Sequence, residues 1–230
     1  ASSPPPLPAG PPPGPPFAPS ATSLFRAIIV LGGLFVATAG LAWVRGYHGQ
    51  WKTKVGFASD QPVLFSHRHH VGELHIDCRF CHVTAETSAF AGLPPTRTCL
   101  VCHSQIFTET AMLRPVVRSA ATGQPLQWNR VNALPDHVFF NHSIHVAKGV
   151  GCTTCHGAIG DMALTMPGQA LEMRWCISCH QNPGPRLRPA SDVFSGAAPP
   201  AENSPQRSRE LVAFYQVHTA HLINCSSCHH

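Results

Sequence analysis

The sequence has little charge. Lys, Arg, Asp and Glu make up 12% of its 230 residues, about half the share of roughly 25% that soluble domains usually carry. It also lacks a basic stretch interleaved with aromatic residues, which argues against nucleic-acid binding despite a formal net charge of +5. We expect a chain whose surface is largely covered by partner proteins or by a membrane.

No cysteine is left over for a disulfide, a zinc site or a nucleophile. All ten cysteines fall in five copies of the pattern C-x-x-C-H, which is the attachment signature of c-type haem. Two thiols bond to the vinyl groups of the haem, and the adjacent His provides the first axial ligand of the iron. Zinc sites, in contrast, pair two C-x-x-C units and need no His after each.

These five copies predict five covalently bound haem c groups. We number the motifs, and the haems that they would hold, 1 to 5 in chain order. Their residues are Cys78, Cys81 and His82; Cys99, Cys102 and His103; Cys152, Cys155 and His156; Cys176, Cys179 and His180; and Cys225, Cys228 and His229.

The N-terminal stretch contains two uncharged or nearly uncharged segments. Residues 1–23 are rich in proline and carry no charge, which predicts an extended or disordered tail. Residues 24–44 form an apolar run with one Arg, and at about 1.5 Å per residue they match a hydrocarbon core of about 30 Å. This run predicts one transmembrane helix. A cleaved signal peptide is the alternative, because Ala37-Thr38-Ala39 resembles a cleavage site, but the run exceeds the roughly 7–15 apolar residues typical of that class.

The flanking charges and the haem motifs disagree about orientation. Arg26 lies on the amino side of the apolar run, whereas Arg45, Lys52 and Lys54 follow it, and the positive-inside rule places such a cluster in the cytoplasm. Attachment of haem to C-x-x-C-H takes place outside the cytoplasmic membrane. We give the haems more weight, and expect a single-pass anchor in the cytoplasmic membrane with the haem domain on the periplasmic side.

The haem motifs belong to an internal repeat. Residues 65–103 contain F-x-H-x-x-H followed by motifs 1 and 2, and residues 140–180 contain the same pattern followed by motifs 3 and 4. The other predicted segments are a linker at 45–64, the duplicated region as a whole at 65–184, a Pro- and Ser-rich arm at 185–214 and a single-haem unit at 215–230. We expect the arm to lie on a neighbouring subunit, since long loops are often binding segments.

Low-spin electron-transfer haems need a second axial ligand, usually His or Met. The best candidates are the repeated pairs in F-x-H-x-x-H, namely His67, His70, His142 and His145. Two histidines three positions apart on a helical turn point in different directions and can serve two different irons. The histidines without a counterpart in the other repeat are expected to be structural or exposed: His48, His69, His75 and His137.

The repeat leaves haem 5 without an assigned second ligand. His221 is the first candidate, because the partial unit keeps H-x-x-H, and Met112 is the second, because Met also ligates haem iron. A Met ligand would raise the potential of that haem relative to two His ligands. The other residues left open are His218, His230, Met162, Met166 and Met173.

Several stretches resemble the pentahaem cytochrome c subunit of alternative complex III, a bacterial quinol:electron-acceptor oxidoreductase. They include FSHRHHVGELHIDCRFCH from residue 65, LPDHVFFNHSIHV from residue 134 and RWCISCHQNP from residue 174. With the repeat, the resemblance implies a mostly irregular and α-helical fold. We expect a multihaem cytochrome c of the class III/c7-like kind, built from two-haem modules, with one N-terminal transmembrane helix.

The resemblance also implies a function. Such a subunit takes electrons from an iron–sulfur subunit and passes them to a monohaem cytochrome c subunit, or to a soluble cytochrome c or copper protein. Polytopic membrane subunits oxidise the quinol, so the chain itself is expected to hold no catalytic residue.

Two other functions fit part of the pattern. A membrane-anchored multihaem quinol dehydrogenase also has one N-terminal helix, but its first haem motif lies close to the membrane. Here residues 45–77 separate the apolar run from Cys78. A pentahaem nitrite reductase needs an open iron, typically at a motif with Lys in place of His, and all five motifs here end in His.

Overall fold

The structure of the chain is a computed structural model that describes residues 10, 14, 19–198 and 201–229. Its contacts divide the chain into an N-terminal unit, Ala1–Lys52, and a haem-motif unit, Thr53–His230. Most of the Pro-rich tail predicted at 1–23 lies outside the described residues, as does His230.

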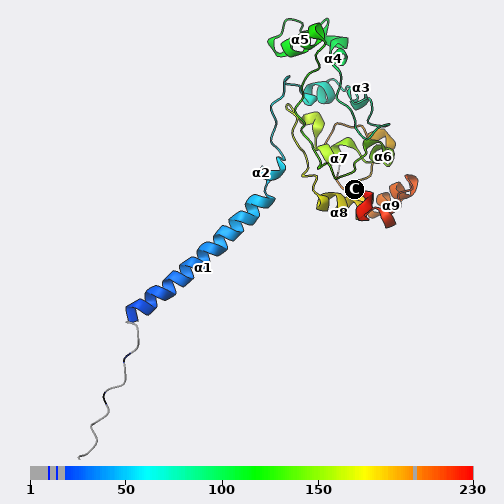
Figure 1. Cartoon of the computed structure of the whole chain (residues 1–230). Helices are drawn as coiled ribbons and strands as arrows, with labels where there is room; N and C mark the ends of the chain where they lie inside the picture. Colours follow the sequence, from blue (N-terminus) through cyan, green and yellow to red (C-terminus); the bar gives the residue numbers. More distant parts are fainter. Residues whose placement is uncertain (1–9, 11–13, 15–18, 199–200, 230) are drawn as a thin grey trace, which may run out of the picture. The chain divides into compact units, whose positions relative to one another are not determined.

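The N-terminal unit is dominated by one long helix, α1 (Pro19–His48), drawn in blue in Figure 1. Within it, the 28 residues Ser20–Tyr47 form an apolar stretch whose most apolar window has a mean hydropathy of 2.2 and no buried side chain. At about 1.5 Å per residue the stretch is about 42 Å long, more than the roughly 30 Å of a hydrocarbon core. The helix is therefore long and apolar enough to cross a membrane, and it extends beyond the predicted 24–44 at both ends. A signal sequence near the N-terminus can also form a helix that is long and apolar enough by this measure.

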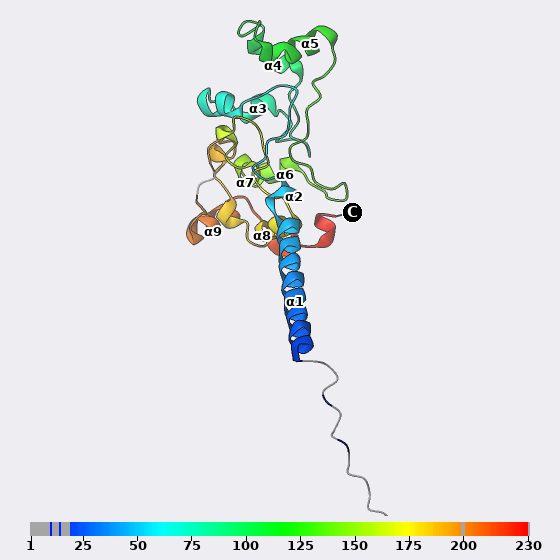
Figure 2. The same ribbon diagram turned by 90° about the vertical axis from the view of Figure 1, so that its left-hand side faces the viewer.

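The haem-motif unit consists of short helices joined by irregular segments (Figures 1 and 2). After α2 (Gln50–Thr53), its α-helices are α3 (Cys78–Cys81), α4 (Thr96–His103), α5 (Arg114–Thr122), α6 (His142–Ala147), α7 (Cys152–His156), α8 (Met173–Gln181) and α9 (Pro205–Phe214). A π-helical turn, η1 (Arg68–Glu73), precedes α3. The 3-10 turns are η2 (Ala111–Leu113), η3 (Ile159–Asp161), η4 (Gly184–Arg186), η5 (Ala190–Asp192), η6 (Thr219–His221) and η7 (Cys225–Ser227). In place of strands, the described residues show two isolated bridges, Val138 with His229 and Val150 with Leu187.

Each C-x-x-C-H motif contains a helical turn: α3, the end of α4, α7, the C-terminal part of α8 and η7. Residues three apart on such a turn lie on one face, so the two cysteines of a motif point the same way. Asp77 starts the first of these turns by accepting a hydrogen bond from the backbone N–H of Arg79 at 2.8 Å. Helix capping of this kind satisfies a free N–H at the helix start.

The haem-motif unit has a small apolar interior. Among the described residues, the buried apolar side chains are Val63, Ala85, Val116, Met162, Leu187, Val193 and Leu211. A buried core residue usually touches about 6–12 others, so seven side chains spread over this length of chain do not form a continuous core. The unit therefore needs further apolar groups to fill its interior.

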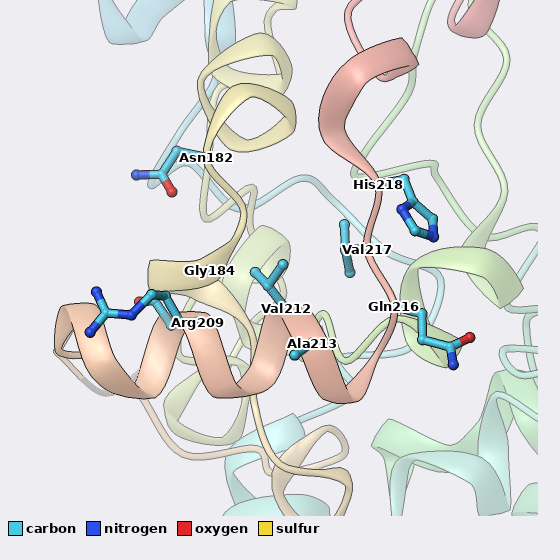
Figure 3. Close-up of a pocket in the computed structure, with 9 residues that line it drawn as sticks. Asn182, Gly184, Arg209, Val212, Ala213, Gln216, Val217 and His218 are labelled. Carbon is cyan, nitrogen blue, oxygen red and sulfur yellow. The ribbon is translucent and has the colours of Figure 1, made fainter.

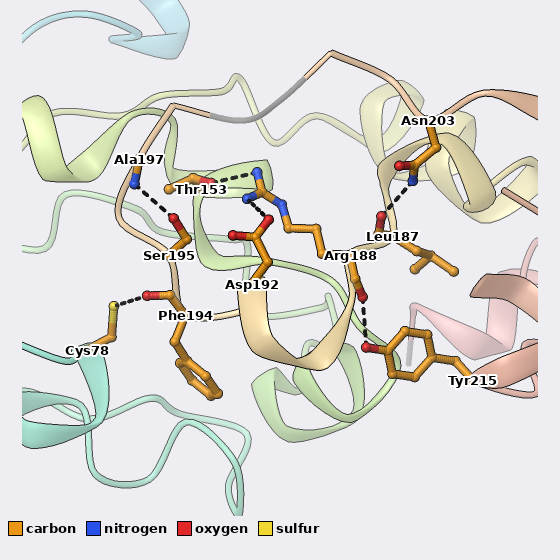
Figure 4. A network of polar contacts seen from close by, with 10 residues as sticks. All are labelled: Cys78, Thr153, Leu187, Arg188, Asp192, Phe194, Ser195, Ala197, Asn203 and Tyr215. Carbon is orange, nitrogen blue, oxygen red and sulfur yellow. Dashed lines mark hydrogen bonds and ion pairs between the residues drawn. The ribbon is translucent and has the colours of Figure 1, made fainter. Parts of the chain in front are cut away.

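Residues 184–198, which overlap the arm predicted at 185–214, pack inside their own unit (Figure 4). The guanidinium of Arg188 is buried, donates to the Thr153 hydroxyl at 2.8 Å and pairs with Asp192 at 3.3 Å. The Tyr215 hydroxyl donates to the Arg188 carbonyl at 2.7 Å. These bonds tie the segment to α7 and to the end of α9. Contact of the remaining stretch with a neighbouring subunit stays a prediction.

The hydrogen bond from the Tyr215 hydroxyl to Arg188 depends on a glycine that lies against the Tyr215 ring. Gly149 has a φ of +78°, and a Cβ at this position would overlap the Tyr215 ring. Left-handed backbone of this kind favours glycine. The close approach lets the Tyr215 ring lie over the turn that leads into α7.

Candidate haem sites

Four of the five motif histidines face a second histidine ring. The ring-centre distances are 6.2 Å for His103 and His70, 6.4 Å for His156 and His142, 6.1 Å for His180 and His145, and 5.5 Å for His229 and His137. A metal–imidazole bond is about 2 Å long and the ring centre lies about 1 Å beyond the nitrogen, so two imidazoles on opposite sides of one iron have centres about 6 Å apart. These four pairs therefore have about the spacing that the two axial ligands of one iron require.

The fifth motif histidine, His82, interacts with His67. Burial lowers the pKa of His67 to about 4, and of the neighbouring imidazoles that lower it further, His82 has the largest effect. The His67 ring is also held by a hydrogen bond between its Nδ1 and the Thr165 hydroxyl at 3.0 Å. All four histidines of the F-x-H-x-x-H repeats thus lie beside a motif histidine.

The histidine rings are oriented by hydrogen bonds at Nδ1. Seven of them lie 2.7–3.4 Å from a backbone carbonyl: His70, His82, His103, His142, His145, His180 and His229. A carbonyl can only accept, so Nδ1 carries the proton and Nε2 keeps a free lone pair. This is the tautomer of a metal-binding histidine, whose other nitrogen usually donates to a carbonyl or carboxylate.

Burial keeps several of these imidazoles neutral. It lowers the pKa of His156 to about 4 and also shifts the pKa of His145 downwards. With pKa values of about 4, His67 and His156 are uncharged near neutral pH. Neutral imidazole is the form that binds a metal, so the environment favours the ligand state before any metal is bound.

The leading aromatic of each F-x-H-x-x-H explains why the pattern is repeated. Phe65 stacks on His70 at 4.4 Å and meets the edge of His67 at 4.9 Å. Phe140 stacks on His145 at 4.7 Å and meets the edge of His142 at 4.8 Å. Aromatic pairs favour these stacked and edge-to-face arrangements. One Phe therefore sets the orientation of two rings that face different motif histidines.

Motif 5 lies beside His137, which was not among the predicted haem ligands. Val138 forms a bridge with His229, and the backbone N–H of Phe139 donates to the Cys228 carbonyl at 2.8 Å. The Nδ1 of His229 lies 3.4 Å from the His137 carbonyl, and the two rings stack with 25° between their planes. The segment 137–139 thus lies along motif 5 and brings His137 to His229.

The predicted partners of haem 5 are absent from the ring pairs that the described residues form with His229. Met112 belongs to η2, just before α5, and both views place α5 far from the C-terminal segment that is drawn in red (Figures 1 and 2). The contacts described for His221 are made by its backbone, whose carbonyl accepts from the Ser227 hydroxyl at 2.9 Å. Local spacing did not reveal His137, because it has no counterpart in the first repeat and pairs with a residue 92 positions away.

These donor sets fit haem better than a bare metal ion. The described residues contain no group of three or more His, Cys, Asp or Glu side chains able to hold a metal. A pair of imidazoles fills two positions of an octahedral iron and leaves four for a porphyrin. None of the ten cysteines is used in a disulfide, so all of them are available for bonds to haem, and the small apolar interior leaves room for macrocycles as the missing apolar filling.

A hollow of about 640 Å³ lies between the end of α8, α9 and the segment Gln216–His218 (Figure 3). Its titratable side chains, Arg209 and His218, lie at opposite sides of the view (Figure 3). Substrate sites usually combine an apolar lining with a few convergent polar groups. This hollow lacks that convergence.

Comparison with known proteins agrees with this geometry. Residues 144–230, which contain motifs 3 to 5, match the family model described as cytochrome c3. The chain is also 29% identical over 171 residues to "Menaquinone reductase, multiheme cytochrome c subunit" of Nitratidesulfovibrio vulgaris (strain Hildenborough), with 74% of this chain and 68% of that protein covered.

The fold prediction is confirmed. The chain contains a cytochrome c3-like multihaem domain that is mostly helical and irregular, without strands in the part that the structure describes, and one N-terminal apolar helix. Its likeness to cytochrome c3 and to a multihaem relative shows that it binds haem c covalently.

Proposed function

We propose that this chain is the electron-relay subunit of a membrane complex that exchanges electrons with a quinone. It holds five haem c groups, one per C-x-x-C-H motif, each with two His ligands. The observation that carries the proposal is the second imidazole about 6 Å from four motif histidines. An iron closed on both sides can accept and pass on an electron but has no free position for a substrate.

The five proposed ligand pairs each join a motif histidine to a second histidine. They are His82 with His67, His103 with His70, His156 with His142, His180 with His145, and His229 with His137. The last pair takes the place of the sequence-based candidates His221 and Met112.

Haem supplies the reversible one-electron change of its iron when bound, and the protein sets the conditions for it. The carbonyl acceptors at Nδ1 fix each ring and raise the basicity of its Nε2. Phe65 and Phe140 hold the repeated rings in place. Burial of His67 and His156 lowers their pKa to about 4 and so favours the neutral, metal-binding form of each ring. Ligand type, burial and hydrogen bonding of this kind tune haem potentials.

The partners proposed from the family resemblance are an iron–sulfur subunit, a monohaem cytochrome c subunit and polytopic membrane subunits, with a soluble cytochrome c or copper protein as the final acceptor. The relative's name supports a quinone-linked complex with several subunits. The apolar helix α1 serves as a single-pass anchor in the cytoplasmic membrane, with the haem domain on the periplasmic side.

The direction of electron flow has two candidates. The resemblance to alternative complex III has electrons leaving quinol, whereas the relative is named a menaquinone reductase, which runs electrons towards the quinone. Pre-reduced complex mixed with menaquinone tests the second direction, and oxidised complex mixed with menaquinol tests the first. The faster oxidation or reduction of haem absorbance identifies the direction that the complex favours.

The alternative function is direct oxidation of quinol by this chain. Gentle detergent extraction followed by affinity purification of the full chain separates the two. We expect an iron–sulfur subunit and polytopic subunits to co-purify, and the chain alone to be reduced by dithionite but not by quinol. Rapid haem reduction by quinol in the isolated chain would favour the alternative.

A further inference from the structure

We infer that the five haems form one unbranched series in the order 2–1–3–4–5, with haem 2 and haem 5 at its ends. This order deepens the proposed function and rests on its haem count. The cysteines indicate this order, because each thioether sulfur lies at the edge of its macrocycle. Thiols of two motifs that interact therefore bring two macrocycle edges together.

Haem 1 has haem 2 as one neighbour. The thiols of Cys81 and Cys99, from motifs 1 and 2, lie close enough to interact electrostatically. The positions of the proposed second ligands support this pairing, because His67 and His70 lie on one helical turn and both contact the Phe65 ring. One turn of chain thus serves both irons.

The other neighbour of haem 1 is haem 3, although motif 2 lies between them in the sequence. The Cys78 and Cys152 thiols lie next to each other, and this pairing lowers the pKa of Cys78 and raises that of Cys152. The same two residues contact consecutive carbonyls of the 184–198 segment, since Cys78 Sγ donates to Phe194 at 3.3 Å and the Cys152 N–H donates to Val193 at 3.1 Å. This segment therefore holds motifs 1 and 3 against each other (Figure 4).

Haem 4 follows haem 3. Burial raises the pKa of the Cys155 thiol, which also lies close enough to Cys179 and Cys176 of motif 4 for these thiols to raise it further by charge repulsion. The second ligands again share one turn, because His142 and His145 lie together on α6 and face motif histidines 3 and 4.

Haem 5 completes the series beside haem 4. Burial raises the pKa of Cys176, and the Cys228 thiol lies close enough to raise it further by charge repulsion. The Nδ1 of His180 lies 2.9 Å from the carbonyl of Leu222, just before motif 5. Both views show the motif helices in the matching order α4, α3, α7 and α8 along the unit, with the C-terminal segment at the α8 end (Figures 1 and 2).

The order has a functional consequence. Electrons that enter at haem 2 must cross haem 1 before haem 3, and electrons that enter at haem 5 cross the same haems in reverse. Motif 2 therefore lies at an end of the path and not in its middle. The partners that deliver and receive electrons are expected to contact the α4 end and the C-terminal end of the haem-motif unit.

The direct test is the position of the five irons in the unmodified full chain. Anomalous scattering from crystals of the complex locates each iron, and the attached cysteine pair identifies its motif. We expect irons 2 and 3 to be the nearest neighbours of iron 1, and irons 3 and 5 to be those of iron 4. An iron 2 that lies closer to iron 3 than iron 1 does would overturn the order. Fewer than five irons would instead contradict the haem count of the proposed function, while the remaining irons would still test the order.

A solution experiment tests the ends of the series. Met in place of a second His raises the potential of that haem, so it takes up its electron first and makes reduction of its neighbours harder by Coulomb repulsion. His70→Met, at an end, should shift the midpoint of one other haem, whereas His142→Met, inside the series, should shift two. Two shifted neighbours for His70→Met would overturn the terminal position of haem 2. The covalent haem count of both variants serves as the control.

Discussion

Replacement of His137 by Ala tests the least expected of the ligand pairs. The centre of the His137 ring lies 5.5 Å from that of His229. As the second ligand, its loss would open one side of the iron of haem 5 and leave the other four irons closed. An open ferric haem becomes high-spin, and one site in five lowers the low-spin signal by about a fifth. The bond from His229 to position 137 uses the backbone carbonyl, so the substitution keeps it.

Electron paramagnetic resonance of the oxidised protein measures this change. We expect about four-fifths of the wild-type low-spin intensity, a new high-spin signal and an unchanged number of covalent haems per chain. The exposed side chain of His137 makes the cost in the free energy of unfolding small, within about 0.5 kcal/mol. The matched control is His221→Ala, which should leave the low-spin signal intact. Loss of a fifth of the signal in His221→Ala, with none in His137→Ala, would refute the assignment.

Three further predictions concern attachment, packing and the anchor. Cys152→Ser weakens or abolishes one attachment, so a fraction of the denatured polypeptide should lose the mass of one haem, and a full complement in every molecule would contradict the role of motif 3. Thr153→Val removes the acceptor of the buried Arg188 guanidinium and should lower the free energy of unfolding by about 1–3 kcal/mol, measured by denaturant titration with Thr154→Val as the control. Alkaline carbonate washing should leave the protein in the membrane pellet because of α1, whereas release into the supernatant would favour a cleaved signal sequence.

Much of the architecture could be predicted from local patterns. C-x-x-C-H specifies its own chemistry, an apolar run of membrane length is visible without a structure, and F-x-H-x-x-H has a local reason, since Phe65 and Phe140 touch the histidines two and five positions later. In each case the residues that interact lie within one or two helical turns. Ligation by the repeated histidines stays a prediction, and the structure adds the ring distances that support it.

What could not be predicted depends on contacts between distant segments. His137 meets His229 through a bridge between segments about 90 residues apart, and no spacing rule relates such residues. Residues 184–198 have the composition of a linker, yet Leu187, Arg188 and Val193 are buried. They contact motif 3 and the turn before it. The order of the haems depends on the same segment, which explains why chain order does not give it.

The central claim, that all five irons are closed by two protein ligands, is tested most directly by counting low-spin haems in the unmodified protein. The full chain is extracted in mild detergent and oxidised, and its low-spin ferric signal is integrated against the polypeptide concentration. The account predicts five low-spin haems per chain and no high-spin signal. Four or fewer, with the remainder high-spin, would contradict it and would indicate an open iron able to bind a substrate.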